Sequence, residues 1–305
     1  MRSTPSITNA LTIDVEDYFQ VSAFAPYIER SDWDLRECRV ERNVERILAL
    51  LQENNTQATF FTLGWIAERY PALVRRIVDG GHELASHGYG HERVSDLSEA
   101  AFFDDIHRAK ALLEDIAGAR VQGYRAPSFS IGAGNLWALD TLQRAGYRYS
   151  SSIYPIRHDH YGMPDAPRFA HQIHGGLIEV PPTTLRIFNR NLPCSGGGFF
   201  RLFPYELSRW MIQQVNLSDA EPAIFYLHPW EIDAEQPRIP GISLKTRFRH
   251  YVNIRRTEQR FSRLLKDFLW GRIDRIFLQD SVSPALVSPN PKPTGFVSHK
   301  SPAHD

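Results

Sequence analysis

The sequence has few cysteines and no net charge, and each shortage excludes a class of protein. The two cysteines, Cys38 and Cys194, lie far apart in the chain, so neither a disulfide framework nor a cysteine metal site is expected. Lys plus Arg and Asp plus Glu number 35 each, so no global field attracts nucleic acid or an anionic bilayer. We therefore expect no nucleic-acid partner.

The sequence also lacks a long apolar run. Residues 1–10 contain none, and Asp14 interrupts the run of residues 11–15, so we see neither a signal peptide nor a membrane span. The default expectation is a cytoplasmic protein with no intrinsic membrane anchor. Association with a membrane or an assembly system through a partner stays open, because a sequence shows only the anchors that its own chain carries.

Short apolar runs alternate with longer stretches of helical periodicity, which is typical of an α/β fold with a largely parallel sheet. No internal repeat interrupts this alternation. The predicted strands are residues 11–15, 58–62, 82–86, 121–124 and 223–227. The predicted helices are residues 40–52, 71–79, 99–116, 136–144, 205–215 and 257–270.

Two clusters of possible metal ligands follow predicted strands. Asp14, Glu16 and Asp17 come as the first strand ends; they are either a solvated turn or a set of acids whose repulsion a cation offsets. His87 and His91 follow the third strand with glycines between them, which favours a loop over a helix. Such a loop can aim both imidazoles at one metal, although two unrelated surface histidines remain the alternative.

Two further clusters follow later strands. Arg125 stands after the fourth strand, where it could grip a carboxylate with two hydrogen bonds or form a structural ion pair. His228 ends the last strand and can donate or accept a proton near neutral pH. A single histidine is more often structural than catalytic, but this one follows three other clusters in order.

Taken together, Asp14, His87, His91, Arg125 and His228 resemble, in order and spacing, the motifs of the polysaccharide deacetylase family, also called the NodB-homology or carbohydrate esterase family 4 domain. Three further segments resemble the branch of this family found in bacterial exopolysaccharide loci, whose members carry a further C-terminal region. These segments are residues 195–201, 228–233 and 249–253.

The resemblance covers roughly residues 11–277 and implies a distorted, incomplete (β/α) barrel of seven strands with a C-terminal extension packed on it. It implies a catalytic domain at residues 11–233, which includes a glycine-rich insert near 195–201, and a family-specific extension at 234–280. Because Pro, Ser and Lys become frequent after residue 280, we expect residues 281–305 to form a mobile tail.

The resemblance also implies roles for single residues. Asp14 matches the general base, Arg125 the arginine that positions it, and His228 the general acid. His87 and His91 match the two metal-binding histidines of the family.

For the third metal ligand, this sequence departs from the commonest family pattern of two adjacent aspartates. Val15 takes the second place, so Glu16 becomes the third ligand, with Asp17 as the alternative. Ser150 stands where a later family motif often has an aspartate. The expected cofactor is one divalent transition metal, with zinc preferred for a site of imidazole and carboxylate ligands.

The function implied is a metal-dependent hydrolase that removes N-acetyl groups from sugars of a polysaccharide or glycan, in exopolysaccharide or cell-envelope metabolism. A backbone N–H near Ser128 would bind the acetyl oxygen, and Tyr154, Trp230 and Phe129 would pack on the acetyl methyl or a sugar, unless these aromatic residues only fill the core. Two alternatives are an amidohydrolase acting on a small cyclic amide and an inactive glycan-binding or assembly protein. The sequence does not indicate the oligomeric state.

Overall fold

The computed structural model describes residues 7–159, 161–173 and 175–278. Its main sheet has the strand order β10-β1-β2-β3-β4-β5-β7-β6, and β11 pairs with β1 beside this path. The strands are β1 (Thr8–Val15), β2 (Thr59–Thr62), β3 (Glu83–Ser86), β4 (Gly123–Tyr124), β5 (Tyr149–Ser150), β6 (His171–Gln172), β7 (Ile178–Glu179), β10 (Ile224–Leu227) and β11 (Leu269–Gly271).

Within the described chain, the seven successive strands from β10 to β7 are all paired in parallel, and β6 runs antiparallel to β7. The end strands β10 and β6 do not pair with each other, so the curled sheet stays open. This arrangement is the distorted, incomplete barrel that the resemblance implies. A separate hairpin of β8 (Thr184–Ile187) and β9 (Arg190–Pro193) forms a second, antiparallel sheet.

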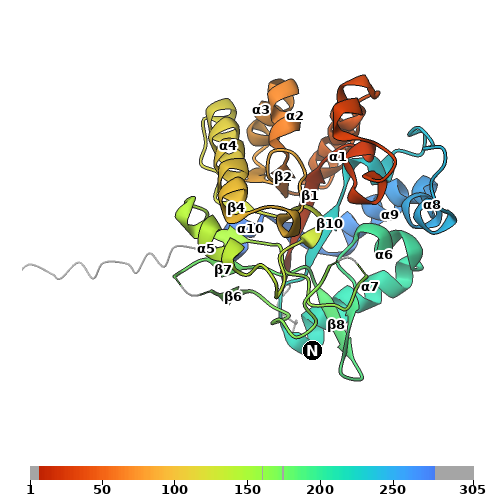
Figure 1. Ribbon diagram of the computed structural model, residues 1–305. Coiled ribbons are helices and arrows are strands. Elements are labelled where there is room, and N and C mark those ends of the chain that lie inside the picture. Colours follow the sequence, from red (N-terminus) through yellow and green to blue (C-terminus); the bar gives the residue numbers. More distant parts are fainter. Residues whose placement is uncertain (1–6, 160, 174, 279–305) are drawn as a thin grey trace, which may run out of the picture.

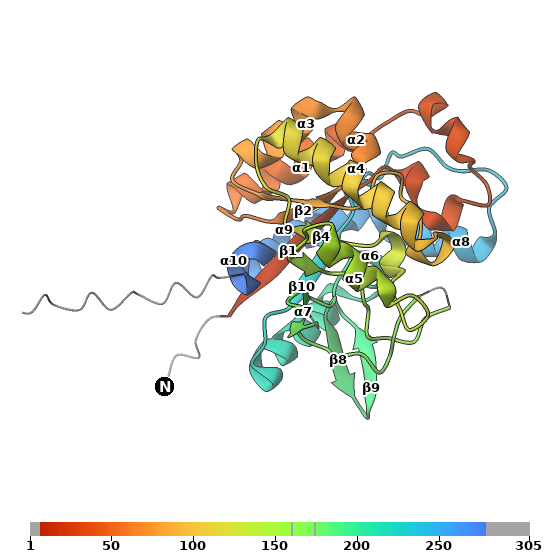
Figure 2. The ribbon, with the colours of Figure 1, turned by 60° about the vertical axis from the view of Figure 1, so that its left-hand side comes forward.

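Helices cover the sheet, and Figure 1 shows α1 to α4 together along one side of it, while the β8–β9 hairpin projects on the other side. Figure 2 shows the same separation after a rotation. The helices are α1 (Val40–Glu53), α2 (Gly64–Arg69), α3 (Pro71–Asp79), α4 (Glu99–Ala117), α5 (Trp137–Arg144), α6 (Gly197–Leu202), α7 (Tyr205–Gln214), α8 (Leu244–Tyr251), α9 (Ile254–Asp267) and α10 (Ile273–Phe277).

Local sequence signals explain where these elements lie. In β1 every residue after Thr8 is buried, as expected for a parallel strand covered on both faces. The α1 helix buries Val44 and Ile47 on one face, at the spacing that predicted it. Ser98 caps α4 through its hydroxyl, and Gly118 ends that helix at a φ of 60°, a conformation that glycine adopts without strain.

The sequence was wrong about one helix boundary. The helix predicted at 257–270 covers Ile254–Asp267 instead, and Trp270 lies in β11. Trp270 leaves the helix because its ring packs on Phe225 in the core while its indole N–H donates to the carbonyl of Leu264. The glycine-rich insert near 195–201 supplies the first turn of α6.

The C-terminal extension packs directly on the barrel. The β11 strand pairs in parallel with the start of β1, and α9 buries Phe261, Leu264 and Leu265 in the same core as α1. The predicted boundary between residues 233 and 234 stays a prediction, and the predicted tail at 281–305 lies outside the described residues. Among the described residues, no helix is both long and apolar enough to cross a membrane.

Gly196 provides a direct test of how closely the glycine-rich insert packs on β10. It adopts a φ of 124°, and a Cβ there would lie 2.0 Å from the carbonyl oxygen of Tyr226 in β10. We expect Gly196→Ala to lower the free energy of unfolding by about 2 kcal/mol or more, measured by denaturant titration. Gly134→Ala is the control, because a Cβ there meets nothing within 4 Å. Equal stability of the two variants would contradict this packing.

Candidate active site

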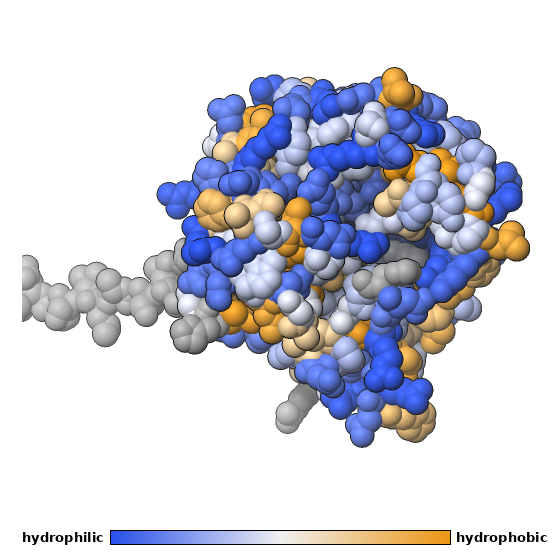
Figure 3. Space-filling view, viewed as in Figure 1, coloured by the Kyte–Doolittle hydropathy of each residue, from blue (hydrophilic) through white to orange (hydrophobic). Residues whose placement is uncertain are grey.

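A large cavity of about 1640 Å³ opens beside the carboxyl ends of the central strands. Figure 3 shows a hollow bordered largely by hydrophilic residues on the face seen in Figure 1. Five residues predicted from separate clusters line the cavity together: Asp14, Glu16, His87, His91 and His228. The parallel strands thus bring to one place side chains that are more than two hundred positions apart in the chain.

Asp14 is fixed by a buried ion pair. Its Oδ1 accepts a 2.6 Å hydrogen bond from Nη1 of Arg125, which also donates to the hydroxyl of Thr12. The other end of the guanidinium donates to the carbonyl and the hydroxyl of Ser151. Arg125 is fully buried and stacks 4.1 Å from the ring of Phe61. Arg125 and Asp14 therefore form the predicted pair. The second carboxylate oxygen, Oδ2 of Asp14, lies 3.8 Å from Nε2 of His228.

Glu16, His87 and His91 form a compact group of possible metal ligands. One ligand atom from each of them lies within 4.8 Å of the others. Oε2 of Glu16 is 2.6 Å from Nε2 of His91 and 4.0 Å from Nε2 of His87. Nδ1 of His87 lies 2.8 Å from the carbonyl oxygen of Arg125, which selects the tautomer whose Nε2 is free to bind a metal.

The segment between the two histidines is a loop, as predicted. Gly88 and His91 have φ angles of 75° and 57°, which no helix contains. The carbonyls of Gly88 and Tyr89 accept hydrogen bonds from the backbone N–H groups of Gly64 and Trp65. These bonds anchor the loop to the start of α2, and the two rings meet edge to face with their centroids 5.3 Å apart.

Asp17, the alternative third ligand, points away from this group. Its carboxylate accepts hydrogen bonds from the backbone N–H groups of Tyr18, Arg39 and Val40, at 2.7, 2.5 and 2.7 Å, and from the thiol of Cys38. It therefore caps the start of α1. The structure places Glu16, and not Asp17, beside the two histidines.

The three ligand candidates fit a divalent cation. Oε2 of Glu16 is buried and makes no well-formed hydrogen bond to a described residue, although Nε2 of His91 lies 2.6 Å away. Such a close, unsatisfied contact is costly unless a cation lies between the two groups. Nearby histidines, against the effect of burial, hold the pKa of Glu16 well below its usual range. Burial lowers the pKa of His87 to about 4, so that its ring is neutral, as a metal ligand must be.

His228 is held by a chain of hydrogen bonds between charged side chains. Its Nδ1 lies 2.6 Å from Oε1 of Glu231, whose Oε2 accepts a 2.6 Å hydrogen bond from Nε of Arg201. Burial alone would lower the pKa of His228, but the carboxylates of Glu16, Glu231 and Asp14 raise it to about 9. Nε2 of His228, which faces the cavity, therefore carries a proton at neutral pH.

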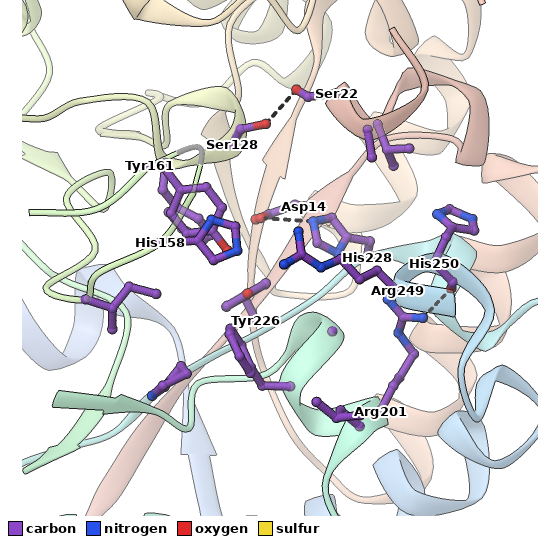
Figure 4. Close-up of a pocket in the computed structure, with 18 of the residues that line it drawn as sticks. Asp14, Ser22, Ser128, His158, Tyr161, Arg201, Tyr226, His228, Arg249 and His250 are labelled. Atoms are coloured by element: carbon purple, nitrogen blue, oxygen red, sulfur yellow. Dashed lines mark hydrogen bonds and ion pairs between the residues drawn. The ribbon is translucent and has the colours of Figure 1, made fainter. Parts of the chain in front are cut away.

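Trp230 joins the metal-ligand group to this chain of hydrogen bonds. Its indole N–H donates to Oε1 of Glu16 at 3.1 Å, and its ring lies between the rings of His228 and His250, with centroid distances of 5.2 and 4.2 Å. In Figure 4, Asp14 and His228 lie centrally, with His250 to one side. His250, from α8, and Arg201, from α6, were not predicted as site residues; only the resemblance of their segments to family motifs pointed to them.

The predicted substrate-binding residues differ in where they lie. Ser128 lines the cavity with Phe129, has a left-handed φ of 55°, and shares a 2.6 Å hydroxyl contact with Ser22. Tyr154, by contrast, is fully buried, with its hydroxyl 2.8 Å from that of Ser195. It lies behind the cavity wall and stacks on Tyr161, which does line the cavity.

Comparisons with known proteins give two family matches. Residues 32–150 match the polysaccharide deacetylase family model, and residues 151–278 match a domain of unknown function, DUF3473. Relatives include a peptidoglycan-N-acetylglucosamine deacetylase of Bacillus cereus, 33% identical over 113 residues that cover 33% of this chain and 41% of the relative. A chitooligosaccharide deacetylase of Azorhizobium caulinodans is 28% identical over 149 residues, which cover 48% of this chain and 67% of the relative.

These matches are partial. The chain spans about two fifths or less of the length of the first relatives, at 41%, 38% and 32%. Among solved structures, a provisionally assigned polysaccharide deacetylase of Mycobacterium smegmatis has a TM-score of 0.58 at 19% identity, with 90% of each chain covered. The Puue allantoinase has a TM-score of 0.54 at 14% identity, with 89% of this chain and 88% of that chain covered. These two similarities show the fold alone.

The ligand group generates a prediction about metal content. We expect Glu16→Ala or His87→Ala to weaken divalent-metal binding by roughly 10–100-fold or more. Removing a residue that only supports a metal ligand already costs that much affinity. Metal titration followed by elemental analysis measures this. Asp17→Asn should keep the metal and instead lower stability by about 2 kcal/mol, because it loses charge-assisted bonds. Loss of metal in Asp17→Asn together with its retention in Glu16→Ala would reverse the assignment.

Proposed function

We propose that the chain is a member of the polysaccharide deacetylase family, whose model matches residues 32–150, and that it hydrolyses N-acetyl groups on sugars of a polysaccharide or glycan. One observation carries the proposal. A carboxylate held by a buried arginine, a Glu-His-His group and a histidine paired with a buried glutamate line the same cavity. Amide hydrolysis needs such a base, electrophile and acid within reach of one carbonyl.

The cavity's dimensions favour a polymer over a small cyclic amide. Its volume of about 1640 Å³ exceeds the roughly 300–1,000 Å³ typical of pockets for small ligands. Several sugar units of a glycan can therefore lie in it at once. Aromatic rings on its wall, from Phe129, Tyr161, Tyr226 and Trp230, offer apolar faces for sugars or for the acetyl methyl.

Glu16, His87 and His91 would hold the metal, for which their two imidazoles and one carboxylate suit zinc. Bound there, a divalent metal supplies a Lewis acid that polarises the acetyl carbonyl and makes water more acidic. The remaining chemistry belongs to the side chains around this group. The backbone near Ser128 would add a hydrogen bond to the developing oxyanion.

Asp14 would act as the general base. Arg125 fixes Oδ1 of Asp14, so only Oδ2 is available to accept a proton from the attacking water. The attack forms a tetrahedral intermediate at the acetyl carbon. Arg125 itself is fully buried and acts through Asp14, which it holds in one orientation.

His228 would act as the general acid. Its Nδ1 is held by Glu231, so Nε2 is the atom that delivers a proton to the sugar nitrogen as the carbon–nitrogen bond breaks. The products are acetate and a free amino sugar. Against the effect of burial, the carboxylates of Glu16, Glu231 and Asp14 raise the pKa of His228 to about 9, so that Nε2 has a proton to deliver.

The C-terminal half supports a narrower context for this activity. Residues 151–278 match DUF3473 and supply Arg201, Glu231 and His250 to the cavity region. We propose that the natural substrate belongs to exopolysaccharide or cell-envelope metabolism, following the resemblance of these segments to proteins of exopolysaccharide loci.

Acetate release from N-acetylated oligosaccharides tests the proposed activity. Asp14→Asn and His228→Ala should each lower kcat by roughly 100-fold or more, because each removes one proton-transfer group. Metal content should stay at the wild-type level in both, since neither is a proposed ligand. Full activity of either variant would show that the residue has no part in the mechanism. If the protein released no acetate from any N-acetylated sugar but hydrolysed a small cyclic amide, it would be an amidohydrolase instead.

The Arg201–Glu231–His228 chain of hydrogen bonds predicts a change in pH dependence. Glu231 raises the pKa of His228, so Glu231→Gln should lower it and move the alkaline limb of the kcat/KM profile to lower pH. We also expect kcat to fall by about 10-fold, because the ring loses the partner that orients it. Glu235→Gln, at an exposed position nearby, is the control. An unmoved alkaline limb would show that Glu231 is only structural.

A further inference from the structure

The cavity carries more positive charge than deacetylation of a neutral sugar requires. Among its described lining residues, seven are Arg or Lys and three are Asp or Glu. Two of the three acids, Asp14 and Glu16, belong to the catalytic centre, so the rest of the wall is strongly basic. The basic residues are Arg93, Arg157, Arg186, Arg190, Arg201, Lys245 and Arg249.

Three of these cations already have anionic partners. Arg201 is buried and paired with Glu231. Lys245 and Arg249 on α8 both pair with Asp159. Their charges are therefore wholly or partly offset within the protein.

The other four have no ion pair or side-chain hydrogen bond to any described residue, and we name them the rim arginines: Arg93, Arg157, Arg186 and Arg190. They come from three separate segments, which are the loop after β3, the loop after β5 and the β8–β9 hairpin. Figures 1 and 2 show that this hairpin lies across the molecule from α1 to α4. The rim arginines therefore line one cavity from three separate segments of the chain.

Unpaired guanidinium groups in a concave site focus positive potential into it. Each group presents a rigid fork of N–H donors that matches the two oxygens of a carboxylate or phosphate. A neutral N-acetylated sugar offers only hydroxyl and amide partners, which need no such concentration of charge.

We propose that the cavity takes an acidic glycan, in which sugars near the N-acetylated unit carry carboxylate or phosphate groups bound by the rim arginines. This inference rests on the proposed deacetylase function and specifies its substrate class. The catalytic centre acts on the acetyl group at the bottom of the cavity. The rim arginines bind the charged neighbouring sugars and so determine which N-acetylated unit reaches the centre.

A matched pair of substrates tests the charge preference. A short hyaluronan oligosaccharide alternates glucuronate with N-acetylglucosamine, and its carboxyl-reduced form is neutral but otherwise the same. For the metal-loaded full chain we expect kcat/KM to be about 10-fold higher for the acidic form, equivalent to one good charge-assisted contact. The difference should shrink as salt is raised from about 0.05 to 0.5 M, because salt screens exposed charges. A phosphodiester-linked N-acetylglucosamine oligomer, compared with a neutral chitin oligomer, provides the phosphate arm.

Charge reversal tests which residues are responsible. The double variant Arg186→Glu with Arg190→Glu should remove the advantage of the acidic substrate, so that acidic and neutral forms react alike. Arg75→Glu is the matched control, because Arg75 is exposed on α3, away from the cavity, and it should behave as the wild-type protein does. Retention of the full acidic preference by the double variant would overturn the role of the hairpin arginines.

Calorimetric binding of the same oligosaccharides separates the two proposals. Equal affinity and equal turnover for acidic and neutral members of both pairs would overturn the acidic-glycan inference and leave the deacetylase function standing. Tighter binding of an acidic member, without acetate release from any N-acetylated substrate, would support the anion-binding cavity and contradict the deacetylase function. Tighter binding together with faster acetate release supports both.

Discussion

The site depends on the buried contact between Arg125 and Asp14. Removing two charges from water costs several kcal/mol per ion, which is recovered only with near-ideal geometry and additional hydrogen bonds. Here Thr12 and Ser151 supply those bonds, so the guanidinium ties β1 to the loops after β4 and β5. The same contact leaves one oxygen of Asp14 free beside His228. Structural and chemical requirements are thus met by a single buried pair.

The second half of the chain completes what the first half begins. The first half supplies the general base, its arginine and the metal-ligand group. The general acid His228 and the residues that hold it come from the second half, namely from the segment after β10 and from α6 and α8. The stack of His228, Trp230 and His250 and the bond from Trp230 to Glu16 connect the two halves at the cavity. Substitutions in the C-terminal region should therefore affect the centre directly.

The sequence predicted an α/β fold with a parallel sheet and the meeting of the main polar clusters, because both follow from local patterns. The incomplete barrel was implied only by the family resemblance. Buried strands and amphipathic helices such as α1 are visible as periodicity, and parallel strands bring their carboxyl ends to one edge. It could not choose between Glu16 and Asp17, since that depends on which carboxylate the N–H groups of Arg39 and Val40 capture. Trp270 was misplaced because packing on Phe225 overrides helical periodicity.

The most direct test of the central claim is anomalous diffraction from crystals of the zinc-loaded protein. The account predicts one strong peak bounded by Oε2 of Glu16 and Nε2 of His87 and His91, with Asp14 and His228 facing the same space. A zinc peak held by Asp17, or a peak far from both histidines, would contradict it.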